Sequence, residues 1–403
     1  MTSTLKNISL RTAALVAAVW GILSCSAGSP EQPENEPKLK IKIPEVEYTA
    51  GYGWAQVEAE GDWTLSVEDG KAWASFKSQD EDGEEVYSSS ISGRGNKADI
   101  ILSWGVNVDK TSRSCTLRLL NASKTATAVL SQKGMTDEPD KPDPSKLKQD
   151  PLASWMELPA VGKNLYFFTH PMTVGGKKNR NYSFAWDLSH LVARWVAYPL
   201  NKSLIGSGKR TDKWGIDPKL PESCQPIISF GAFSGFGARG HQIPSADRLN
   251  YDQNVETFYG TNMTPQDYDF NGGKWAQLEQ YVRDRSARFD TLYVVTGCSV
   301  SQDSGYSYDN VGKKVAIPSG YFKALLGYSK SMTAGKTASQ GGYTAIGFYY
   351  PEEKYKQSYQ NVSMTIRELE NILGIDFFVN LPAAIGSELA EKVETTQDSW
   401  WKN

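Results

Sequence analysis

The residues best suited to acid–base chemistry lie around His241, one of three histidines in the sequence. His241 follows Gly240 in a polar loop, with Arg239 and Arg248 nearby. Gly240 permits a close backbone approach that a side chain would block. An imidazole with a pKa of about 6.5 is largely neutral at pH 7 and can accept a proton. The sequence therefore predicts a general base at His241. The alternative, which holds for most single histidines, is a structural or exposed residue.

Asn271 and Glu279 are candidate ligands of a hard metal ion. They lie eight residues apart in a predicted helix over residues 271–289. At about 100° per residue their side chains are about 80° apart and can face one side. An amide oxygen and a carboxylate suit Mg²⁺, which takes few protein ligands and keeps several waters, while a substrate phosphate completes its shell. The alternatives are an N-cap role for Asn271 and a solvated helix position for Glu279.

An α+β domain of about 250 residues, over 151–403, is predicted to position these side chains. Its helices are expected at 271–289 and 365–373, where apolar residues recur at spacings of three and four. Its buried strands are expected at 195–198 and 292–295, which are short apolar runs.

Residues 40–134 are predicted to form an all-β sandwich, because short β-rich segments recur between Gly and Asp/Asn turns about every 8–15 residues. The linker that follows, 135–150, is rich in charge and contains three prolines. The expected strands are residues 55–59, 63–67, 99–104, 115–120 and 127–131.

The first residues have the pattern of an export signal. Two basic residues precede an apolar run at 13–23 that is too short to span a bilayer. The run ends in Ser24-Cys25 and resembles a bacterial lipoprotein signal, with cleavage before Cys25 and a lipid on its sulfur. An ordinary secretory signal is the alternative. Residues 1–25 are thus the predicted signal peptide, and 26–39, rich in Pro and Glu, suit a flexible tether. We expect a lipoprotein at the outer membrane, in the periplasm or on the cell surface.

The charge distribution excludes one class of protein, and the cysteine spacing argues against a zinc site. Residues 1–150 carry 17 Lys+Arg against 22 Asp+Glu, and residues 151–403 carry 26 against 24. This excludes a wholly basic nucleic-acid coat, although a local basic patch stays open. Cys115, Cys224 and Cys298 lack metal-ligand spacing, so a zinc site is not expected. We expect buried free thiols, with a Cys224–Cys298 bridge as the alternative.

Three motifs stand at fixed distances from His241. They are Arg-Gly-His241 followed by Gln-Ile-Pro, Thr-Asn262-Met-Thr-Pro-Gln266, and Phe-Asn271-x-Gly-x-Trp-x-x-Leu-Glu279. The spacings from His241 are 21 residues to Asn262, 30 to Asn271 and 38 to Glu279. This order resembles the DNA/RNA non-specific endonucleases of the ββα-metal, or His-Me finger, superfamily, a group that includes endonuclease G. The resemblance covers residues 153–390. Supporting matches are Trp195-Val196-Ala197-Tyr198, Arg210-x-Asp212-x-Trp214-x-x-Asp217-Pro218, Ile317-Pro318-x-x-Tyr321-Phe322-Lys323 and Gly374-Ile375-Asp376-Phe377-Phe378.

The resemblance implies an endonuclease that cuts DNA and RNA to 5′-phosphate ends without sugar or sequence preference. It implies that His241 is the general base and Asn271 the one direct protein ligand of Mg²⁺, with Mn²⁺ as an alternative metal. Glu279 would orient metal-bound waters. Arg210 would contact the scissile phosphate, and Asn262 would position His241 or the phosphate. The expected substrate-binding residues are Arg239, Lys209 and Gln266.

One position departs from the family pattern. The family usually has Asp before Arg-Gly-His, and here that position is Ala238. The departure affects the expected rigidity of the loop and the expected rate of cleavage more than the reaction type.

A track of basic side chains is also expected to bind the phosphates of the substrate. Its members are Lys177, Lys178, Arg180, Lys209, Arg210 and Lys213. For the first three, the alternative is a solvated loop.

The sandwich carries a second resemblance. Gly61-Asp62-Trp63, then Trp73 and Trp104, and the ending Leu130-Ser131-Gln132-Lys133-Gly134 resemble BACON-type immunoglobulin-like modules. The name of these modules suggests carbohydrate binding, so glycan contact is one expected role. A spacer is the favoured role, and the tryptophans are expected to be core residues rather than sugar platforms.

Two other functions compete with the nuclease. The first is a surface binding protein for nucleic acid or glycan, whose nuclease fold is impaired at Ala238. The retained His241, Asn262, Asn271 and Glu279 argue against it. The second is a glycan-binding sandwich with an accessory nuclease, which glycan binding by residues 40–134 would support.

Overall fold

The computed structural model describes most of the chain, namely residues 36–79, 85–330, 341–398 and 401. Pro37–Asn403 forms one compact unit. The predicted signal peptide with Cys25, and residues 26–35 of the predicted tether, lie outside the described residues. The tether was predicted to reach residue 39, but a β-strand already begins at Lys38. Within the described part of the chain, no helix is long and apolar enough to cross a membrane.

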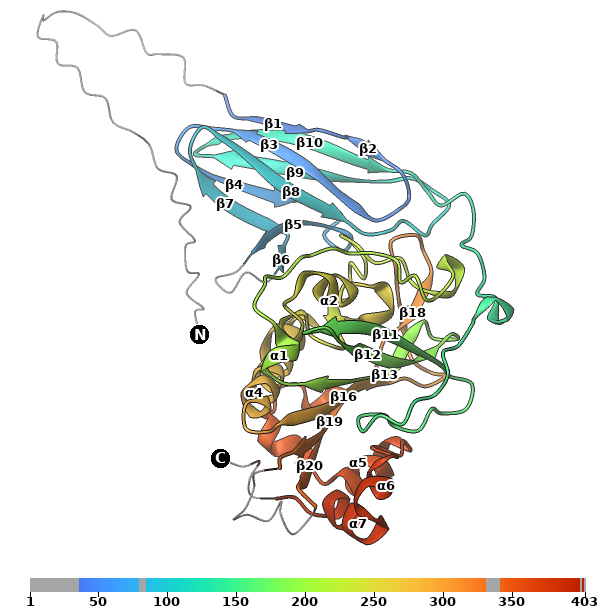
Figure 1. The fold of residues 1–403 in the computed structure, drawn as a ribbon. Helices are drawn as coiled ribbons and strands as arrows, with labels where there is room; N and C mark the ends of the chain where they lie inside the picture. The colour runs from blue at the N-terminus through green and yellow to red at the C-terminus, as the bar shows by residue number, and fades with distance from the viewer. Residues whose placement is uncertain (1–35, 80–84, 331–340, 399–400, 402–403) are drawn as a thin grey trace, which may run out of the picture. The chain divides into compact units, whose positions relative to one another are not determined.

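The N-terminal region is a sandwich of two five-stranded sheets (Figure 1). The first sheet contains, in spatial order, β1 (Lys38–Ile41), β3 (Gly51–Glu58), β8 (Lys97–Trp104), β5 (Ala74–Gln79) and β6 (Glu85–Ser88). The second contains β2 (Glu45–Val46), β10 (Lys124–Gln132), β9 (Arg113–Asn121), β4 (Asp62–Val67) and β7 (Ser90–Arg94). All five predicted strands are present, as parts of β3, β4, β8, β9 and β10.

The sandwich core confirms the expected role of two of its tryptophans. Along β4, Trp63, Leu65 and Val67 alternate toward the interior, with the period of two that a half-buried strand requires. Trp63 and Trp104 are each 5% exposed and belong to the core between the sheets. Trp73 is half-buried at the edge of that core, with the guanidinium carbon of Arg113 4.2 Å from its ring centroid. Neither Trp63 nor Trp104 is available as a sugar platform.

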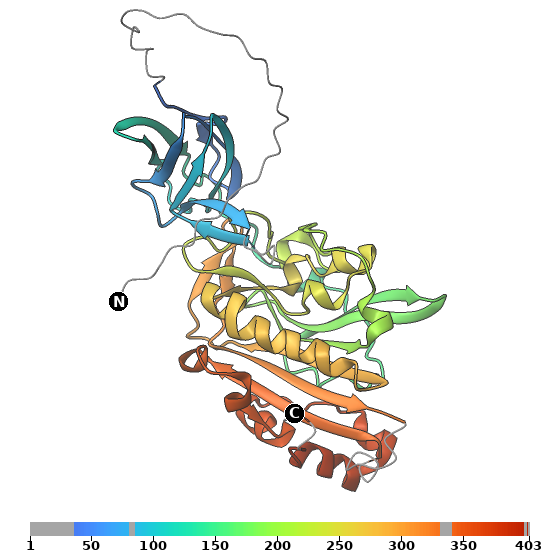
Figure 2. The same ribbon diagram turned by 90° about the vertical axis from the view of Figure 1, so that its left-hand side faces the viewer.

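A seven-stranded antiparallel sheet forms the centre of the C-terminal region (Figures 1 and 2). In spatial order it contains β11 (Tyr166–Val174), β12 (Lys177–Asp187), β13 (Val192–Leu200), β16 (Thr291–Ser299), β19 (Gly320–Tyr328), β20 (Tyr343–Pro351) and β21 (Ser363–Met364). Two hairpins lie outside it: β14 (Ala238–His241) with β15 (Met263–Gln266), and β17 (Tyr306–Tyr308) with β18 (Lys314–Ala316).

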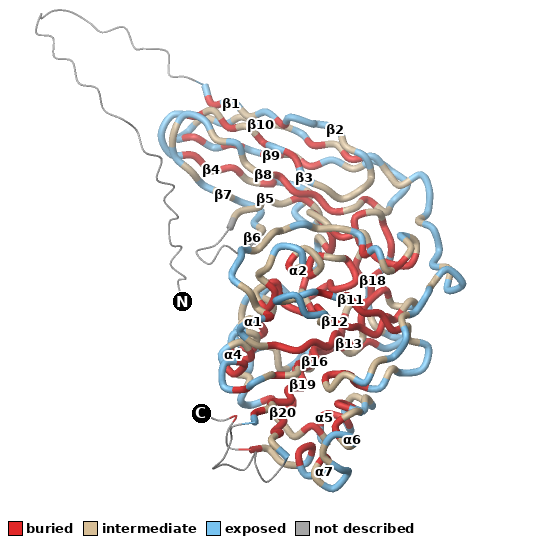
Figure 3. Tube along the Cα trace, viewed as in Figure 1, coloured by how far each residue is buried: buried red, intermediate tan, exposed pale blue. Residues whose placement is uncertain are grey.

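Both faces of this sheet are covered, which explains its continuous apolar runs. Strand β13 is buried along nearly all of its length (Figure 3). Its Trp195 and Ala197 belong to one core cluster, while Val196 and Tyr198 belong to the other. The predicted buried strands at 195–198 and 292–295 are therefore confirmed, in β13 and β16. The helices outside the active-site region are α1 (Lys202–Ile205), α2 (Tyr251–Glu256), α5 (Ile366–Leu373), α6 (Leu381–Ile385) and α7 (Ser387–Thr395).

The two predicted helices are present on opposite faces of the sheet. In α4 (Ala276–Ser286), Leu278 and Val282 pack into the first core cluster, together with Trp275 just before the helix. In α5, Ile366 and Leu369 pack into the second cluster. Thr365 and the side chain of the glutamate three residues later form a capping box at the start of α5. The three described cysteines are buried free thiols, as expected, and the alternative Cys224–Cys298 bridge is absent.

The helix that carries Asn271 begins earlier than its apolar pattern indicates. A short α3 (Tyr268–Phe270) leads into a π-turn, η5 (Asn271–Trp275), and then into α4. The N-cap is Asp267, whose carboxylate accepts a hydrogen bond from the Phe270 N–H at 2.8 Å. Asn271 therefore does not cap the helix, and its amide is available for another role.

We predict that Asp267→Ala lowers the free energy of unfolding by about 0.5–2 kcal/mol, because the Phe270 N–H loses its acceptor. Asp267→Asn keeps an acceptor and should cost less. The control is Asp269→Ala, an exposed acid in the same turn, which should change the free energy by about 0.5 kcal/mol or less. Urea unfolding followed by tryptophan fluorescence measures all three. Equal losses for Asp267→Ala and Asp269→Ala would show that the cap does not stabilise this turn.

Candidate active site

The antiparallel pairing of β14 with β15 fixes the direction of the His241 side chain. His241 pairs with Met263, and Gly240 pairs with Thr264. Side chains alternate along a strand, so His241 and Arg239 share one face and Gly240 lies on the other. A Cβ on Gly240 would lie 2.1 Å from Oε1 of Gln266. Gly240 is thus needed because the Gln266 side chain lies directly against its backbone.

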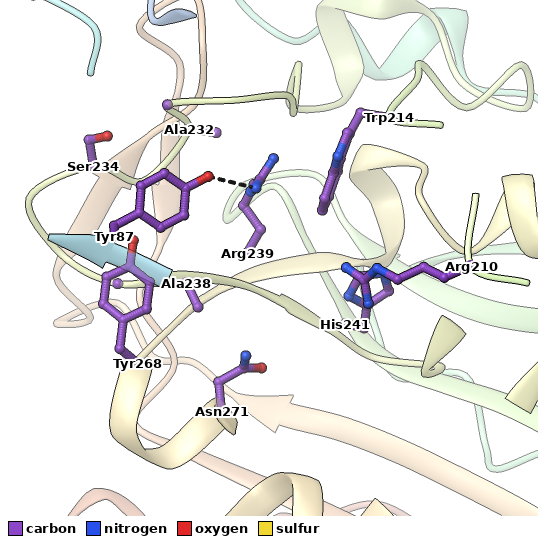
Figure 4. Close-up of a pocket in the computed structure, with 12 residues that line it drawn as sticks. Tyr87, Arg210, Trp214, Ala232, Ser234, Ala238, Arg239, His241, Tyr268 and Asn271 are labelled. Atoms are coloured by element: carbon purple, nitrogen blue, oxygen red, sulfur yellow. Dashed lines mark hydrogen bonds between the residues drawn. The ribbon is translucent and has the colours of Figure 1, made fainter. Parts of the chain in front are cut away.

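One pocket gathers the main predicted site residues. His241, Arg210, Arg239 and Asn271 all line it, and so does Ala238, the first residue of β14 (Figure 4). The remaining lining side chains that carry an aromatic ring are Trp214, Tyr87 and Tyr268. The strand pair β14–β15 and the helix that follows supply His241 and Asn271, which are 30 residues apart in the sequence. The ββα unit therefore brings together the predicted base and the predicted metal ligand.

His241 is held in its neutral form. Its ring packs against Phe258, with ring centroids 5.0 Å apart, and against Trp214 at 5.9 Å. Its Nε2 is buried and has no hydrogen-bond partner within the part of the chain that the structure describes. Burial lowers the pKa of His241 well below its ordinary value of 6.5, and the charges of Arg210 and Arg239 lower it further. A neutral imidazole at pH 7 can accept a proton.

The other two histidines are paired with carboxylates. Nε2 of His170 lies 3.0 Å from Oδ2 of Asp217, and Nδ1 of His190 lies 2.8 Å from Oδ2 of Asp187. Their contacts place them in structural roles. His241 differs from both, because cations rather than carboxylates surround it.

Two guanidinium groups flank His241, each braced by an aromatic ring. The guanidinium carbon of Arg239 lies 3.9 Å from the Trp214 ring centroid. That of Arg210 lies 5.0 Å from the Phe258 ring centroid, and its Nε donates to Oδ1 of Asp212 at 2.9 Å. Planar guanidinium groups held in this way suit a phosphate, which they can contact through several N–H donors.

Asn262 holds the backbone just after His241. Its Oδ1 accepts from the Ile243 N–H at 2.9 Å, and its Nδ2 donates to the Ile243 carbonyl at 3.0 Å and to the Thr257 carbonyl at 2.8 Å. The side chain is fully buried and does not line the pocket. Of the two roles expected for Asn262, these contacts fit the positioning of the His241 segment rather than a contact with phosphate.

Of the two predicted metal-site residues, Asn271 lines the pocket and Glu279 does not. Asn271 is the first residue of the π-turn, and its amide points into the pocket (Figure 4). Glu279 is half-buried on α4 and does not line this pocket. The wide π-turn between the two residues changes the regular α-helical rotation on which their predicted common face rested. Glu279 acts electrostatically on the buried Lys323. Burial lowers the pKa of Lys323, the negative charge of Glu279 opposes that shift, and the resulting pKa is about 8.

Five other predicted residues do not line the pocket. Gln266 is 1% exposed and packs on Gly240, on the face of β14–β15 opposite His241. Lys209 is exposed and does not line this pocket. In the expected basic track, Arg180 forms a two-bonded ion pair with the buried Glu157, with Nη2 and Oε2 2.6 Å apart. Lys177 and Lys178 are exposed at the β11–β12 turn, as the solvated-loop alternative expects.

The two tyrosines that line the pocket were not predicted. Tyr268 lies three residues before Asn271, between the predicted residues Gln266 and Asn271. Tyr87 comes from β6 of the sandwich, and nothing in the sequence links it to His241.

Comparisons with known proteins agree with the motifs. The profile of the DNA/RNA non-specific endonuclease family matches residues 164–384. A nuclease of Nostoc sp. is 30% identical over 216 residues, which are 53% of this chain and 76% of that protein. A nuclease of Serratia marcescens is 31% identical over 205 residues, which are 50% of this chain and 73% of that protein.

Two further proteins are similar over a smaller share or at lower identity. The mitochondrial nuclease EXOG of Homo sapiens is 30% identical over 215 residues, or 50% of this chain and 56% of that protein. A crystal structure of the EndoG/EndoGI complex covers 53% of this chain and 87% of its own chain, with 22% identity and a TM-score of 0.40.

We predict that His241 titrates below pH 6.5 in the folded protein, because burial and two guanidinium groups disfavour the imidazolium. Arg239→Gln removes one of these charges and should raise the pKa of His241. Arg118→Gln, at an exposed position of β9, should leave it unchanged. The measurement is an NMR titration of the imidazole Cε1–H signals, assigned with His241→Gln. A parent His241 that titrates at or above about 6.5 would refute the electrostatic description of this site.

Proposed function

The chain belongs to the DNA/RNA non-specific endonuclease family, and we propose that the pocket around His241 hydrolyses phosphodiester bonds of DNA and RNA with Mg²⁺. One observation carries the proposal: a neutral imidazole, two guanidinium groups and an amide oxygen line the same pocket. Phosphodiester hydrolysis requires a proton acceptor, cations for the phosphate and stabilisation of the leaving oxygen. These groups match those requirements.

His241 acts on the attacking water. The water oxygen attacks phosphorus while the imidazole takes a proton from it, and the bond from phosphorus to the 3′ oxygen breaks. The 3′ oxygen takes up a proton from solvent, which leaves a 3′-hydroxyl on one fragment and a 5′-phosphate on the other. A general base of this kind contributes about 10²–10⁴-fold to the rate.

Arg210 and Arg239 bind the phosphate and stabilise the charge that grows on it. Both guanidinium groups are braced by rings, at 5.0 and 3.9 Å, so little reorganisation is needed when the charge develops. Burial lowers the pKa of His241, and the same two charges lower it further, so the imidazole is neutral before the substrate binds. Contacts to the phosphate carry no base information, so little sequence preference is expected.

Asn271 would hold the divalent cation. Its amide oxygen is a hard ligand of the kind that Mg²⁺ takes, and waters and the substrate phosphate would complete the shell. The cation would act as a Lewis acid on the leaving 3′ oxygen. Ala238 lines the same pocket, so the acid usual in the family is missing beside this position. Glu279 keeps its proposed role only through the waters, since it does not line the pocket.

The proposal predicts that three variants fail in different ways. His241→Ala should lower single-turnover cleavage about 10²–10⁴-fold while DNA and Mg²⁺ still bind. Asn271→Ala should recover part of its loss at high Mg²⁺, because it removes a metal ligand. Arg210→Ala should weaken both turnover and DNA binding, because a guanidinium contacts phosphate in the ground and transition states.

The measurement is single-turnover cleavage against Mg²⁺ concentration, with DNA binding followed separately. His190→Gln is the matched control, because His190 pairs with Asp187 and does not line the pocket. It should cut at the parent rate. If His241→Ala cleaved at the parent rate, His241 would not be the general base, and the proposed function would be refuted.

We also propose that the protein is exported and held on a membrane by a lipid on Cys25, a residue outside the described part of the chain. The support is the Ser24-Cys25 sequence after a short apolar run. Cys25→Ala should move the protein from the membrane fraction to the soluble fraction, whereas Ser29→Ala in the tether should not. Membrane association that persists in Cys25→Ala would rule out this anchor.

A further inference from the structure

The loop that leads into β14 rests on the sandwich. The Phe230 ring lies 4.6 Å from the ring of Tyr52, between centroids, and Nζ of Lys77 lies 3.8 Å from the Phe230 centroid. A Cβ on Gly231 would lie 2.2 Å from the Trp104 carbonyl oxygen. These contacts place the sandwich directly against the segment that leads to Arg239 and His241. A spacer would not need contacts of this kind.

The sandwich also supplies part of the active-site wall. Tyr87 of β6 lines the pocket, and its hydroxyl accepts a hydrogen bond from Nη2 of Arg239 at 3.0 Å (Figure 4). On the nuclease side, Tyr268 stands with its ring centroid 6.1 Å from that of Tyr87. Tyr268 is 43% exposed and lies three residues before Asn271. Two aromatic rings, one from each region, thus stand beside the proposed phosphate site.

A second cavity continues from this point along the seam between the two regions. It has a volume of about 260 Å³ and shares Tyr87, Ser234 and Tyr268 with the active-site pocket. Its further lining includes Lys71 and Trp73 of the sandwich. Small-molecule sites have volumes of about 300–1,000 Å³, so this cavity is of a size for part of one strand and not for a duplex.

We propose that the sandwich forms a substrate subsite, in which an unpaired base next to the scissile phosphate stacks on Tyr268 and Tyr87. Aromatic rings bind the face of any base, and a basic side chain such as Lys71 can follow the backbone. A base inside a duplex is already stacked and paired, and its removal from the duplex costs free energy. The subsite therefore favours single strands over duplexes. This inference rests on the proposed nuclease function and adds a role for the N-terminal region.

The test uses a single-stranded oligonucleotide with one cleavable phosphodiester, all other linkages being phosphorothioates. An abasic residue is placed on the 5′ or the 3′ side of the cleavable bond. In the parent, the abasic residue on one of the two sides should raise KM about tenfold, the size of one lost base–aromatic stack. Tyr268→Ala should raise KM of the normal strand by a similar factor, and the abasic residue should then have no further effect.

Tyr87 is tested by two variants that separate its ring from its hydroxyl. Tyr87→Phe keeps the ring and should keep the abasic effect on KM, whereas Tyr87→Ala should lose it. Tyr251→Ala is the matched control, because Tyr251 is 62% exposed and lines neither cavity. It should behave as the parent.

Parent-like KM values in both Tyr87→Ala and Tyr268→Ala, or an abasic effect that persists in them, would overturn the subsite. Failure of the parent to cut any strand would instead overturn the proposed function, and the subsite would fall with it. The two failures are therefore distinguishable.

Discussion

The geometry of the site depends on a short strand pair that needs support from a residue outside it. Strands β14 and β15 are four residues long each, yet they must keep His241 opposite a turn that is 30 residues away in the sequence. Asn262 makes this possible. Its side-chain amide hydrogen-bonds the Ile243 N–H at 2.9 Å and the Ile243 carbonyl at 3.0 Å. Its backbone carbonyl accepts a hydrogen bond from the Gln242 N–H at 2.9 Å. A fully buried amide that lost these partners would leave several backbone groups unsatisfied. The direction of the His241 side chain therefore depends on a residue that does not line the pocket.

The same few charges serve two purposes in this arrangement. Burial, together with the charges of Arg210 and Arg239, lowers the pKa of His241, so the proposed base is neutral before a substrate binds. In the proposed reaction, the negative charge of a phosphate in the pocket would offset the charges of the guanidinium groups and favour the imidazolium that proton transfer creates. A carboxylate partner, as His170 and His190 have, would favour the imidazolium before the water is in place. Because position 238 is alanine, no carboxylate there offsets the positive charges of Arg210 and Arg239 in the pocket.

The sequence could predict the parts of the site that local patterns encode. His241, Arg210 and Asn271 were expected together, and they line one pocket. The apolar spacing of Trp275, Leu278 and Val282 predicted the helix, but not the π-turn that sets where Asn271 and Glu279 point. Gln266 was expected at the substrate, and its alternation within β15 turns it to the far face. Tyr87 could not be found at all, because it is 152 residues from Arg239 and their contact depends on how two regions pack. Long-range packing leaves no periodic signal in one sequence.

The most direct measurement is cleavage by the purified chain from residue 26 onward. Supercoiled plasmid and single-stranded RNA are incubated with it in Mg²⁺ or in EDTA, and the new ends are tested for a 5′-phosphate by ligation. We expect nicked and then linear plasmid, shortened RNA and ligatable ends in Mg²⁺, and no cleavage in EDTA. Intact plasmid and RNA in Mg²⁺, from protein that is folded and binds DNA, would contradict the nuclease function and favour a binding protein built on this fold.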